Sequence, residues 1–239
     1  MNLPLSVLNL ELVRHGHDWS DTTQFIPFEQ TAVAAQKAGI SIGDYIDTTY
    51  NVPGATQATI DQMKALGVFA GKVDAVCEIG PGSGRYTEKT IATCHPIHYE
   101  IYETAKPWEK YVAAKYKVVP RLCDGHSLSQ TPSASLDLLH AHKVFVCTPF
   151  VVTYTYFLEI ARVVRPGGKV AFDVMTEECV GDSELRAWLD SGVQLGSYPN
   201  LLPKQHVIQF FTKRDFAFDG SFFVPMKPGK TECLVFTRR

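Results

Sequence analysis

Hydrophobic and polar positions change period along most of this chain, and the changes predict its secondary structure. Short apolar runs bounded by turn residues are typical of buried strands, whereas apolar residues three or four apart are typical of helices. The predicted strands cover residues 73–79, 97–103, 118–122, 135–141, 169–175, 206–212 and 231–237. The predicted helices between them follow the glycines at 80–84 and cover residues 107–116, 151–164 and 183–189.

This order of elements predicts an α/β fold. Strands that alternate with helices form a mostly parallel sheet with helices on both faces, which here is a Rossmann-like, doubly wound sheet of seven strands. The last two predicted strands, 206–212 and 231–237, have turn-prone residues between them. They predict an antiparallel hairpin, which is a permitted edge for such a sheet.

The first seventy residues have a different pattern. Residues 27–39 begin with a proline and end with a glycine, which are start and stop signals for a helix, and residues 56–66 repeat this plan. A turn-rich stretch at 51–54 separates them. We therefore expect a helical extension over residues 1–70, which acts as a lid that excludes water, and a main domain over residues 71–239.

Composition narrows the function classes. The chain has 239 residues, of which 45% are hydrophobic, and this is enough for one well-buried core. Its 23 basic and 25 acidic residues give a net charge of −2, without the basic stripe expected of nucleic-acid-binding proteins. No apolar run reaches the roughly 18 residues of a membrane span. The start lacks the features of a secretory signal, so we expect a cytoplasmic protein with no nucleic-acid or membrane partner.

The cysteines also favour a reducing compartment. They are Cys77, Cys94, Cys123, Cys147, Cys179 and Cys233, and no two form a Cys-x-x-Cys pair. Several lie in apolar runs, where a reduced cysteine behaves as a small hydrophobic residue. The spacing of Cys123 and His126 suits two metal ligands, but no second pair completes a set, so the interpretation as core thiols is preferred.

The glycine-rich stretch after the first strand of the main domain is the most informative segment. Glu78 is followed by Gly80, Pro81, Gly82 and Gly84, and a predicted helix comes next. Glycines at such a turn let the backbone approach a ligand closely. The free N–H groups at the helix N-terminus then face an electronegative group of that ligand.

The Glu-x-Gly-x-Gly-x-Gly spacing resembles motif I of the class I S-adenosylmethionine (SAM)-dependent methyltransferases. Glu103 ends the second strand, 19 residues after Gly84, where the resemblance implies a carboxylate on the ribose hydroxyls; Glu100 is the fallback. Asp124, Gly125 and His126 follow the third strand, where family members place an acid near the adenine. Residues 136–139 and the Pro-Gly-Gly turn at 166–168 resemble further landmarks of this superfamily. The resemblance covers roughly residues 50–239 and implies SAM as the cofactor.

Candidate catalytic residues follow the fourth strand. His140 and His142 are two apart, so on a strand they point the same way. They lie at the strand end, where ligands bind in this fold, so one or both can face the transferring methyl. Histidine is the usual general base near neutral pH, and removing a proton from an alcohol acceptor requires one. We predict His142 as the base, ahead of His140, because it is nearer the strand end.

Two other polar clusters are candidates for contact with the methyl acceptor. Residues 14–19 contain Arg14, His15, His17 and Asp18, and are either a substrate-binding cluster or an exposed loop. Carboxylates at Asp173, Glu177 and Glu178 are placed to hold a divalent cation, but they form no clear ligand set, so metal dependence is not favoured.

The acceptor itself is the least determined feature. Residues 140–143 stand where methyltransferases acting on amide or base nitrogens carry an Asn-Pro-Pro-Tyr-like tetrapeptide, so a hydroxyl of a small molecule is favoured. The glycine loop, residues 99–108, residues 140–146 and the final Pro-Gly-Lys-Thr-Glu resemble bacterial sugar O-methyltransferases. The alternatives are a SAM-binding protein without catalysis, methyl transfer to a nitrogen or carboxylate, and aminopropyl transfer, which is ranked lowest. Pairing of two chains is left open.

Overall fold

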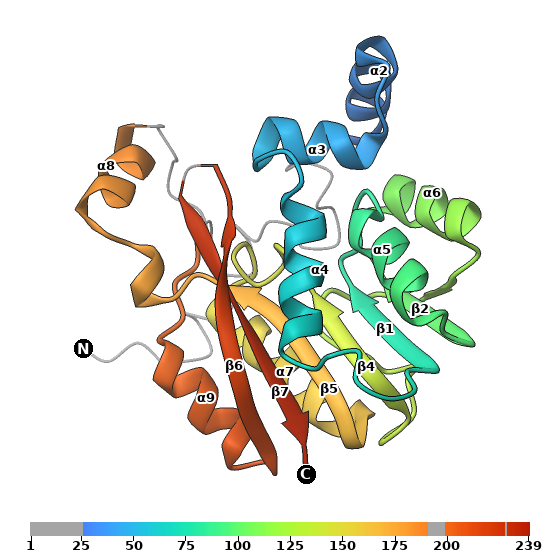
Figure 1. Cartoon of the computed structure of the whole chain (residues 1–239), viewed down its shortest axis with the longest axis vertical. Coiled ribbons are helices and arrows are strands. Elements are labelled where there is room, and N and C mark those ends of the chain that lie inside the picture. Colours follow the sequence, from blue (N-terminus) through green and yellow to red (C-terminus); the bar gives the residue numbers. More distant parts are fainter. Residues whose placement is uncertain (1–25, 191–198, 228) are drawn as a thin grey trace, which may run out of the picture.

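The computed structural model describes residues 26–190, 199–227 and 229–239. Across these residues a seven-stranded sheet has the order β3-β2-β1-β4-β5-β7-β6 (Figure 1). Strands β1 to β5 pair in parallel, whereas β7 is antiparallel to both β5 and β6. The strands are β1 (Ala75–Ile79), β2 (His98–Tyr102), β3 (Val119–Arg121), β4 (Leu136–Ala141), β5 (Val164–Val174), β6 (Phe216–Pro225) and β7 (Lys230–Arg238). This is the predicted doubly wound α/β fold, with its antiparallel hairpin at one edge.

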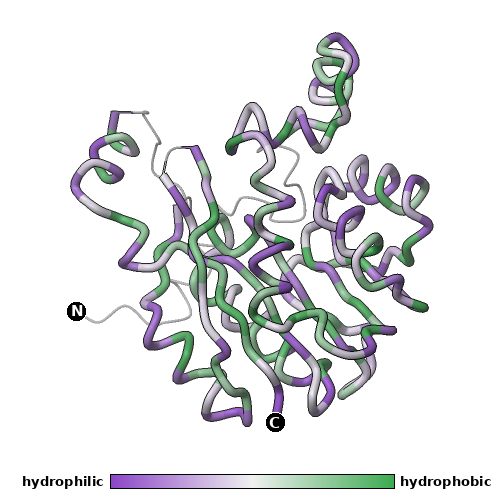
Figure 2. The backbone as a smooth tube through the Cα atoms, in the orientation of Figure 1, coloured by the Kyte–Doolittle hydropathy of each residue, from purple (hydrophilic) through white to green (hydrophobic). Residues whose placement is uncertain are grey.

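Helices cover both faces of the sheet. One face packs against α4 (Ala55–Ala65), α5 (Arg85–Cys94) and α6 (Lys106–Tyr116), and the other packs against α7 (Phe150–Val163) and α9 (Lys204–Thr212). The remaining elements are α2 (Phe28–Ala38), α3 (Ile42–Tyr50), the short turn η2 (Glu177–Cys179) and α8 (Asp182–Asp190). Figure 2 shows hydrophobic positions along the central strands and hydrophilic positions on the outer helices. Since both faces of the sheet are covered, a central strand such as β4 is buried at every residue.

The face under α7 and α9 is held by aromatic side chains. Phe157 of α7, Phe172 of β5 and Phe211 of α9 are fully buried, and their ring centroids lie 4.9–5.5 Å apart. Phe236 of β7 extends the group, with its centroid 4.8 Å from that of Phe211. Each such pair contributes about 0.5–1.5 kcal/mol beyond its area burial, so this cluster fixes the hairpin and α9 onto the parallel part of the sheet.

One predicted strand is wrong. Residues 206–212 lie in α9, because Val207 and Phe211, four apart, are the residues it buries, as on one face of a helix, and Pro203 caps its start. The first strand of the hairpin is β6 instead. Its register shifts between Phe218 and Gly220, and this irregularity breaks the alternation that would have predicted it.

The N-terminal region divides into two parts. Ile60 and Met63 of α4 are buried in the core of the main domain, whereas α2 and α3 extend beyond the sheet (Figure 1). Helix α3, which the pattern did not predict, begins at Ser41, whose hydroxyl accepts the N–H of Asp44 at 3.0 Å. Of the described helices within the expected lid over residues 1–70, α4 belongs to the core of the main domain, and only α2 and α3 lie outside it. No helix of the described residues is long and apolar enough to cross a bilayer.

Candidate functional site

A pocket of about 230 Å³ opens at the carboxyl ends of β1, β2, β3 and β4. Ligands bind at this edge in open α/β sheets, because the loops there leave a crevice between the two helical layers. Its walls come from the glycine loop, the segments after β2, β3 and β4, the start of α7, and the N-terminal region. Residues that line the pocket include Ile26, Ile46, Gly80, Pro81, Gly82, Arg85, Tyr86, Tyr102, Glu103, Trp108, Cys123, Gly125, His142, Lys143, Cys147, Val152 and Tyr156.

The glycines of the loop have different functions. A Cβ at Gly80 would lie 2.6 Å from Cγ2 of Val144, and one at Gly84 would lie 2.4 Å from Cε2 of Tyr116, so both positions are required for packing. Gly82 differs, because a Cβ there meets no atom of the described residues within 4 Å. Since Gly82 also lines the pocket and has a φ of 50°, its missing side chain leaves space on the ligand side of the loop.

Glu103 follows β2 directly and places a carboxylate against the loop. Its Oε2 accepts the N–H of Gly82 at 2.9 Å, and its Oε1 accepts the N–H of Ala105 at 2.9 Å. The side chain is buried, and burial raises the pKa of the carboxyl above its usual value. A carboxylate has about four acceptor directions, so Glu103 retains capacity for ligand hydroxyls.

The other expected acids do not enter the pocket. Asp124 accepts the N–H groups of His126 and Ser127 at 2.9 and 2.7 Å, which stabilises a turn, and only its neighbours Cys123 and Gly125 line the pocket. The side chain of His126 is 60% exposed. Glu100, the fallback for Glu103, is buried against Arg121 on the edge strand, at 2.7 Å, so the structure does not bring it to the ligand.

Glu78 lies beneath the loop instead of in the pocket wall. Its Oε2 accepts the hydroxyls of Thr87 and Tyr99, both at 2.6 Å. The residue is 1% exposed, and burial raises the pKa of its carboxyl to about 7. Pro81, by contrast, lines the pocket directly.

His142 is the predicted catalytic residue that the pocket contains. Its ring stacks on Tyr86 of α5, with centroids 3.9 Å apart and planes inclined by 20°. Neither ring nitrogen has a hydrogen-bond partner among the described residues. Burial lowers the pKa of His142 to about 4, so the imidazole is neutral at pH 7 and has a free lone pair. This is the protonation state that a general base needs.

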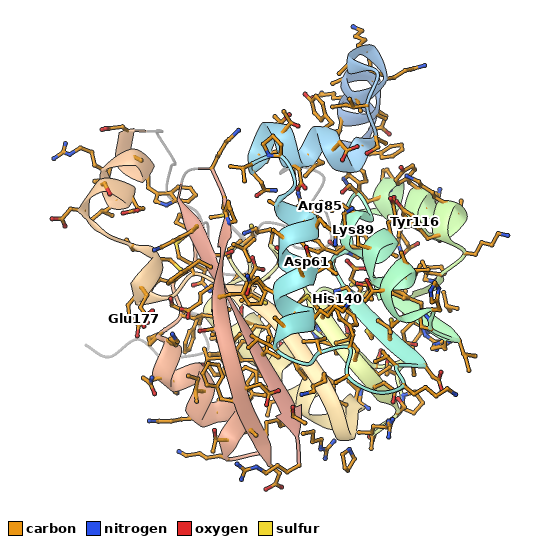
Figure 3. The ribbon with its side chains drawn as sticks, in the orientation of Figure 1. Asp61, Arg85, Lys89, Tyr116, His140 and Glu177 are labelled. Atoms are coloured by element: carbon orange, nitrogen blue, oxygen red, sulfur yellow. The ribbon has the colours of Figure 1, made fainter. Side chains whose placement is uncertain are left out.

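His140 does not line the pocket, so of the two candidate histidines only His142, the preferred one, lies there. It lies on β4 (Figure 3). It is fully buried, and its Nε2 lies 2.8 Å from the hydroxyl of Tyr99. Burial lowers its pKa well below the usual value. The physical reason is that β4 ends at Ala141, so His140 is still within the covered sheet and only His142 reaches the open edge.

Sequence reasoning missed Lys143 as a member of the site. Its backbone N–H donates to Oδ1 of Asp173, and its ammonium lies 3.0 Å from Oδ2 of the same carboxylate. Thr231 of β7 donates to that Oδ2 at 2.6 Å. Burial acts to raise the pKa of Asp173, but Lys143, His142 and these hydrogen bonds outweigh it, and the pKa lies below its ordinary value. The sequence signal for this site was Asp173 within the apolar strand 169–175, since a buried carboxylate needs a cationic partner.

The acids at the end of β5 and in the turn that follows it do not converge on one point. Asp173 is bound to Lys143, Glu177 accepts the N–H of Lys204 at 2.8 Å, and Glu178 faces the ammonium of Lys204 at 3.4 Å. No group of three potential metal ligands occurs within the described ranges.

The N-terminal region supplies part of the pocket wall. Asp47 of α3 pairs with Arg85 of α5 at 2.9 Å, and both side chains are about nine-tenths buried. Trp108 of α6 donates its indole N–H to the carbonyl of Ile26 at 2.8 Å. Figure 3 shows Arg85 beside α3 and α4, where it follows the glycine loop. The polar cluster at residues 14–19 lies outside the described residues.

Comparison with known proteins agrees with this geometry. A family model described as a methyltransferase domain matches residues 77–172, which run from β1 into β5. No curated protein matches the sequence.

Among solved structures, magnesium protoporphyrin IX methyltransferase from Synechocystis PCC 6803 with bound SAH aligns at a TM-score of 0.65 and 11% identity, over 96% of this chain and 100% of that chain. N-methyltransferase NodS from Bradyrhizobium japonicum WM9 in complex with S-adenosyl-L-homocysteine aligns at 0.60 and 15% identity, over 87% and 98% of the two chains. A SAM-dependent methyltransferase from Methanosarcina mazei aligns at 0.54 and 10% identity, over 71% and 94%.

Proposed function

Since this chain contains a class I SAM-dependent methyltransferase domain and its cofactor is SAM, we propose that it methylates a hydroxyl of a small molecule, with His142 as the general base. The observation that carries this proposal is the placement of His142. It is a buried, neutral imidazole in the wall of the pocket, and no described residue occupies its nitrogens.

The pocket has the features that SAM requires. The space beside Gly82 and the N–H groups at the start of α5 suit a ligand with polar groups that approaches the backbone closely. Glu103 would accept hydrogen bonds from the ribose hydroxyls of SAM, and Cys123 and Gly125 would border its adenine ring. When bound, SAM supplies a methyl group on a sulfonium, which is already activated for displacement. Positioning by these residues then supplies much of the rate.

Proton removal is the chemistry left to the protein. An alcohol is a weak nucleophile until its proton is withdrawn, and a base with a free lone pair contributes about 10²–10⁴-fold. His142 is held by its stack on Tyr86, and the Lys143–Asp173 pair fixes the backbone that follows it. The negative charge of Asp173 also favours the imidazolium formed once His142 takes up the proton.

The lining indicates the kind of acceptor. The aromatic and aliphatic side chains of Trp108, Tyr156, Ile46 and Val152 offer apolar and stacking surfaces, which suit a sugar ring or a phenol. Both cations of the wall, Arg85 and Lys143, are already paired with carboxylates, so they favour a neutral acceptor. The fold alone leaves the acceptor atom open, since the similar structures include an N-methyltransferase.

The test is transfer of labelled methyl from SAM to two matched sets of acceptors. One set contains methyl glycopyranosides and simple phenols, and the other contains the corresponding amines. We expect label in the hydroxyl set, and a loss of at least about 100-fold in His142→Ala with SAH binding retained. His206→Ala, an exposed histidine on α9, is the matched control and should keep full activity.

Each other result changes a particular part of the proposal. Full turnover by His142→Ala would exclude that residue as the base. Label only on the amines would move the acceptor to nitrogen. No transfer to either set, with SAH bound normally, would favour a SAM-binding protein without catalysis.

A further inference from the structure

A chain of buried polar groups lies beside His142, and the function proposed above does not use it. His140 is the neighbouring histidine, with a ring centroid 5.3 Å from that of His142. Its Nε2 lies 2.8 Å from the hydroxyl of Tyr99, and that hydroxyl lies 2.6 Å from Oε2 of Glu78. All three residues beyond His142 are almost wholly buried, and none lines the pocket.

The possible positions of the hydrogens give this row of polar groups two hydrogen-bonding states. The hydroxyl of Tyr99 carries one hydrogen, so it donates either to Glu78 or to His140. When Glu78 is ionised, Tyr99 donates to it, and His140 must carry its proton on Nε2. When Oε2 of Glu78 is protonated, it donates to Tyr99, which donates to Nε2, and the proton of His140 is then on Nδ1. The tautomer of His140 therefore follows the charge of Glu78.

We propose that His140 and Tyr99 relay the acceptor's proton from His142 to Glu78, which stores it during methyl transfer. The inference rests on the proposed function. The step balances as follows: the His142 imidazolium gives its proton to Nδ1 of His140, Nε2 of His140 gives its proton to the oxygen of Tyr99, and Tyr99 gives its own to Oε2 of Glu78. The net change is that His142 returns to its neutral form and Glu78 becomes a neutral acid.

The unpaired nitrogens of His140 and His142 support a connection between the two rings. Nδ1 of His140 and both nitrogens of His142 have no partner within the described part of the chain. The ring centroids are 5.3 Å apart with planes inclined by 44°, so the relay requires a rotation of one ring or one bridging water between the two histidines. Buried polar atoms are nearly always paired, so a pair of adjacent histidines with open nitrogens requires a reason beyond packing. Proton exchange between the two rings provides one.

The surroundings of Glu78 make it a suitable proton store. The groups that face it are Thr87 and Arg85 from α5, Tyr99 from β2, His140 from β4 and Glu103 from the loop after β2. Burial and Glu103 favour the neutral acid, whereas the hydroxyl donors and Arg85 favour the carboxylate. These opposing effects leave the pKa at about 7, so both forms are accessible near neutral pH.

The first experiment reads the tautomer of His140 and needs no acceptor. Full-length protein labelled with ¹⁵N-histidine, in complex with SAH, is titrated across pH 7 by NMR. We expect His140 to carry its proton on Nε2 above the midpoint and on Nδ1 below it. In Glu78→Gln and in Tyr99→Phe the tautomer should no longer change with pH. A tautomer that stays fixed in the wild type would overturn the relay, because Glu78 would then titrate without His140.

The second experiment measures turnover with methyl glucopyranoside and a simple phenol as the probe acceptors. Tyr99→Phe should lower kcat at least tenfold, flatten its pH profile and leave KM for SAM unchanged. Tyr111→Phe, on the outer helix α6, is the matched control and should change none of these. A Tyr99→Phe enzyme with wild-type kcat and pH profile would refute the relay, whatever the NMR result.

The two arms separate failure of the relay from failure of the proposed function. A normal tautomer change in a wild type that methylates neither probe would refute the proposed function, and would reduce the chain to a buried hydrogen-bond network. Turnover that depends on His142 but not on Tyr99 would retain the proposed function and remove the relay.

Discussion

The two walls of the pocket are built in different ways. The wall that we propose to bind the cofactor, residues 80–83 with Glu103, is called the cofactor wall below. It consists of backbone turns and one carboxylate held by two backbone N–H groups. The acceptor wall, His142, Lys143 and Trp108, consists of side chains held by distant residues. Tyr86 stacks on His142, Asp173 and Thr231 bind Lys143, and Ile26 accepts from Trp108.

The two walls therefore respond differently to substitution. The cofactor wall depends on the backbone conformation of the short glycine motif and on the hydrogen bonds that Glu103 accepts from backbone N–H groups. The acceptor wall depends on buried polar pairs, and a buried charge that loses its partner is strongly destabilising. Variation of the acceptor wall therefore has to change both members of a pair together. This constraint links substrate choice to stability.

Removal of Lys143 is expected to give the largest effect. Lys143→Met leaves the carboxylate of Asp173, which is fully buried, without its cation. Breaking such a pair costs about 3–5 kcal/mol of unfolding free energy, which urea denaturation would measure.

A matched pair elsewhere in the sheet provides the control. Lys169 binds Asp219 at 3.1 Å and also donates to Thr237, so it repeats the lysine, aspartate and threonine of the acceptor wall, but near the surface. Lys169→Met should cost no more than about 1 kcal/mol, because exposed ion pairs contribute little. Equal losses in the two variants would show that burial does not distinguish the two pairs.

The fold and the cofactor wall could be predicted because their signals are local. The glycine spacing and the alternation of strands with helices each occupy short stretches, and they point to Gly82 and Glu103, which line the pocket. The strand expected at 206–212 failed for a related reason. A helix with two aromatic residues at its end resembles a strand over seven positions, and a bulge in β6 hid the actual strand.

The acceptor wall could not be predicted because it depends on tertiary pairing. Thr231 and Lys143 are 88 positions apart, and no spacing rule connects them. His140 and His142 show the limit most clearly. Strand alternation places both on one side, but only the position at which β4 ends decides that one reaches the pocket and the other is buried.

The pH dependence of stability tests the neutral, buried state of His142. Its pKa is about 4 in the folded protein against 6.5 in the unfolded chain, so the unfolded chain binds more protons between these values. The free energy of unfolding should therefore fall as pH drops from 6.5 to 4, with roughly 3 kcal/mol from this residue. His140 contributes in the same direction, so the quantity to measure is the difference between wild type and His142→Gln.

We expect this difference to change across that pH range and to be constant above pH 6.5. A difference that is constant throughout would mean that the pKa of His142 is the same in the folded and unfolded protein, as for a solvated side chain. Its assignment as a general base with a free lone pair would then lose its support.

The smallest expected effect tests the cofactor wall. Gly82→Ala places a methyl group in the space beside the loop, and should weaken SAH binding at least tenfold, or about 1.4 kcal/mol, by calorimetric titration. Gly82 has a φ of 50°, so alanine also strains the backbone by about 1–2 kcal/mol. Gly167→Ala separates the two effects, because Gly167 has a φ of 79°, equally open surroundings and an exposed position in β5, outside the pocket lining. Both variants should lose similar stability, but only Gly82→Ala should lose affinity. Equal SAH affinity in the two would show that the ligand does not occupy the space beside Gly82, and the cofactor wall would have to be moved toward Cys123 and Gly125.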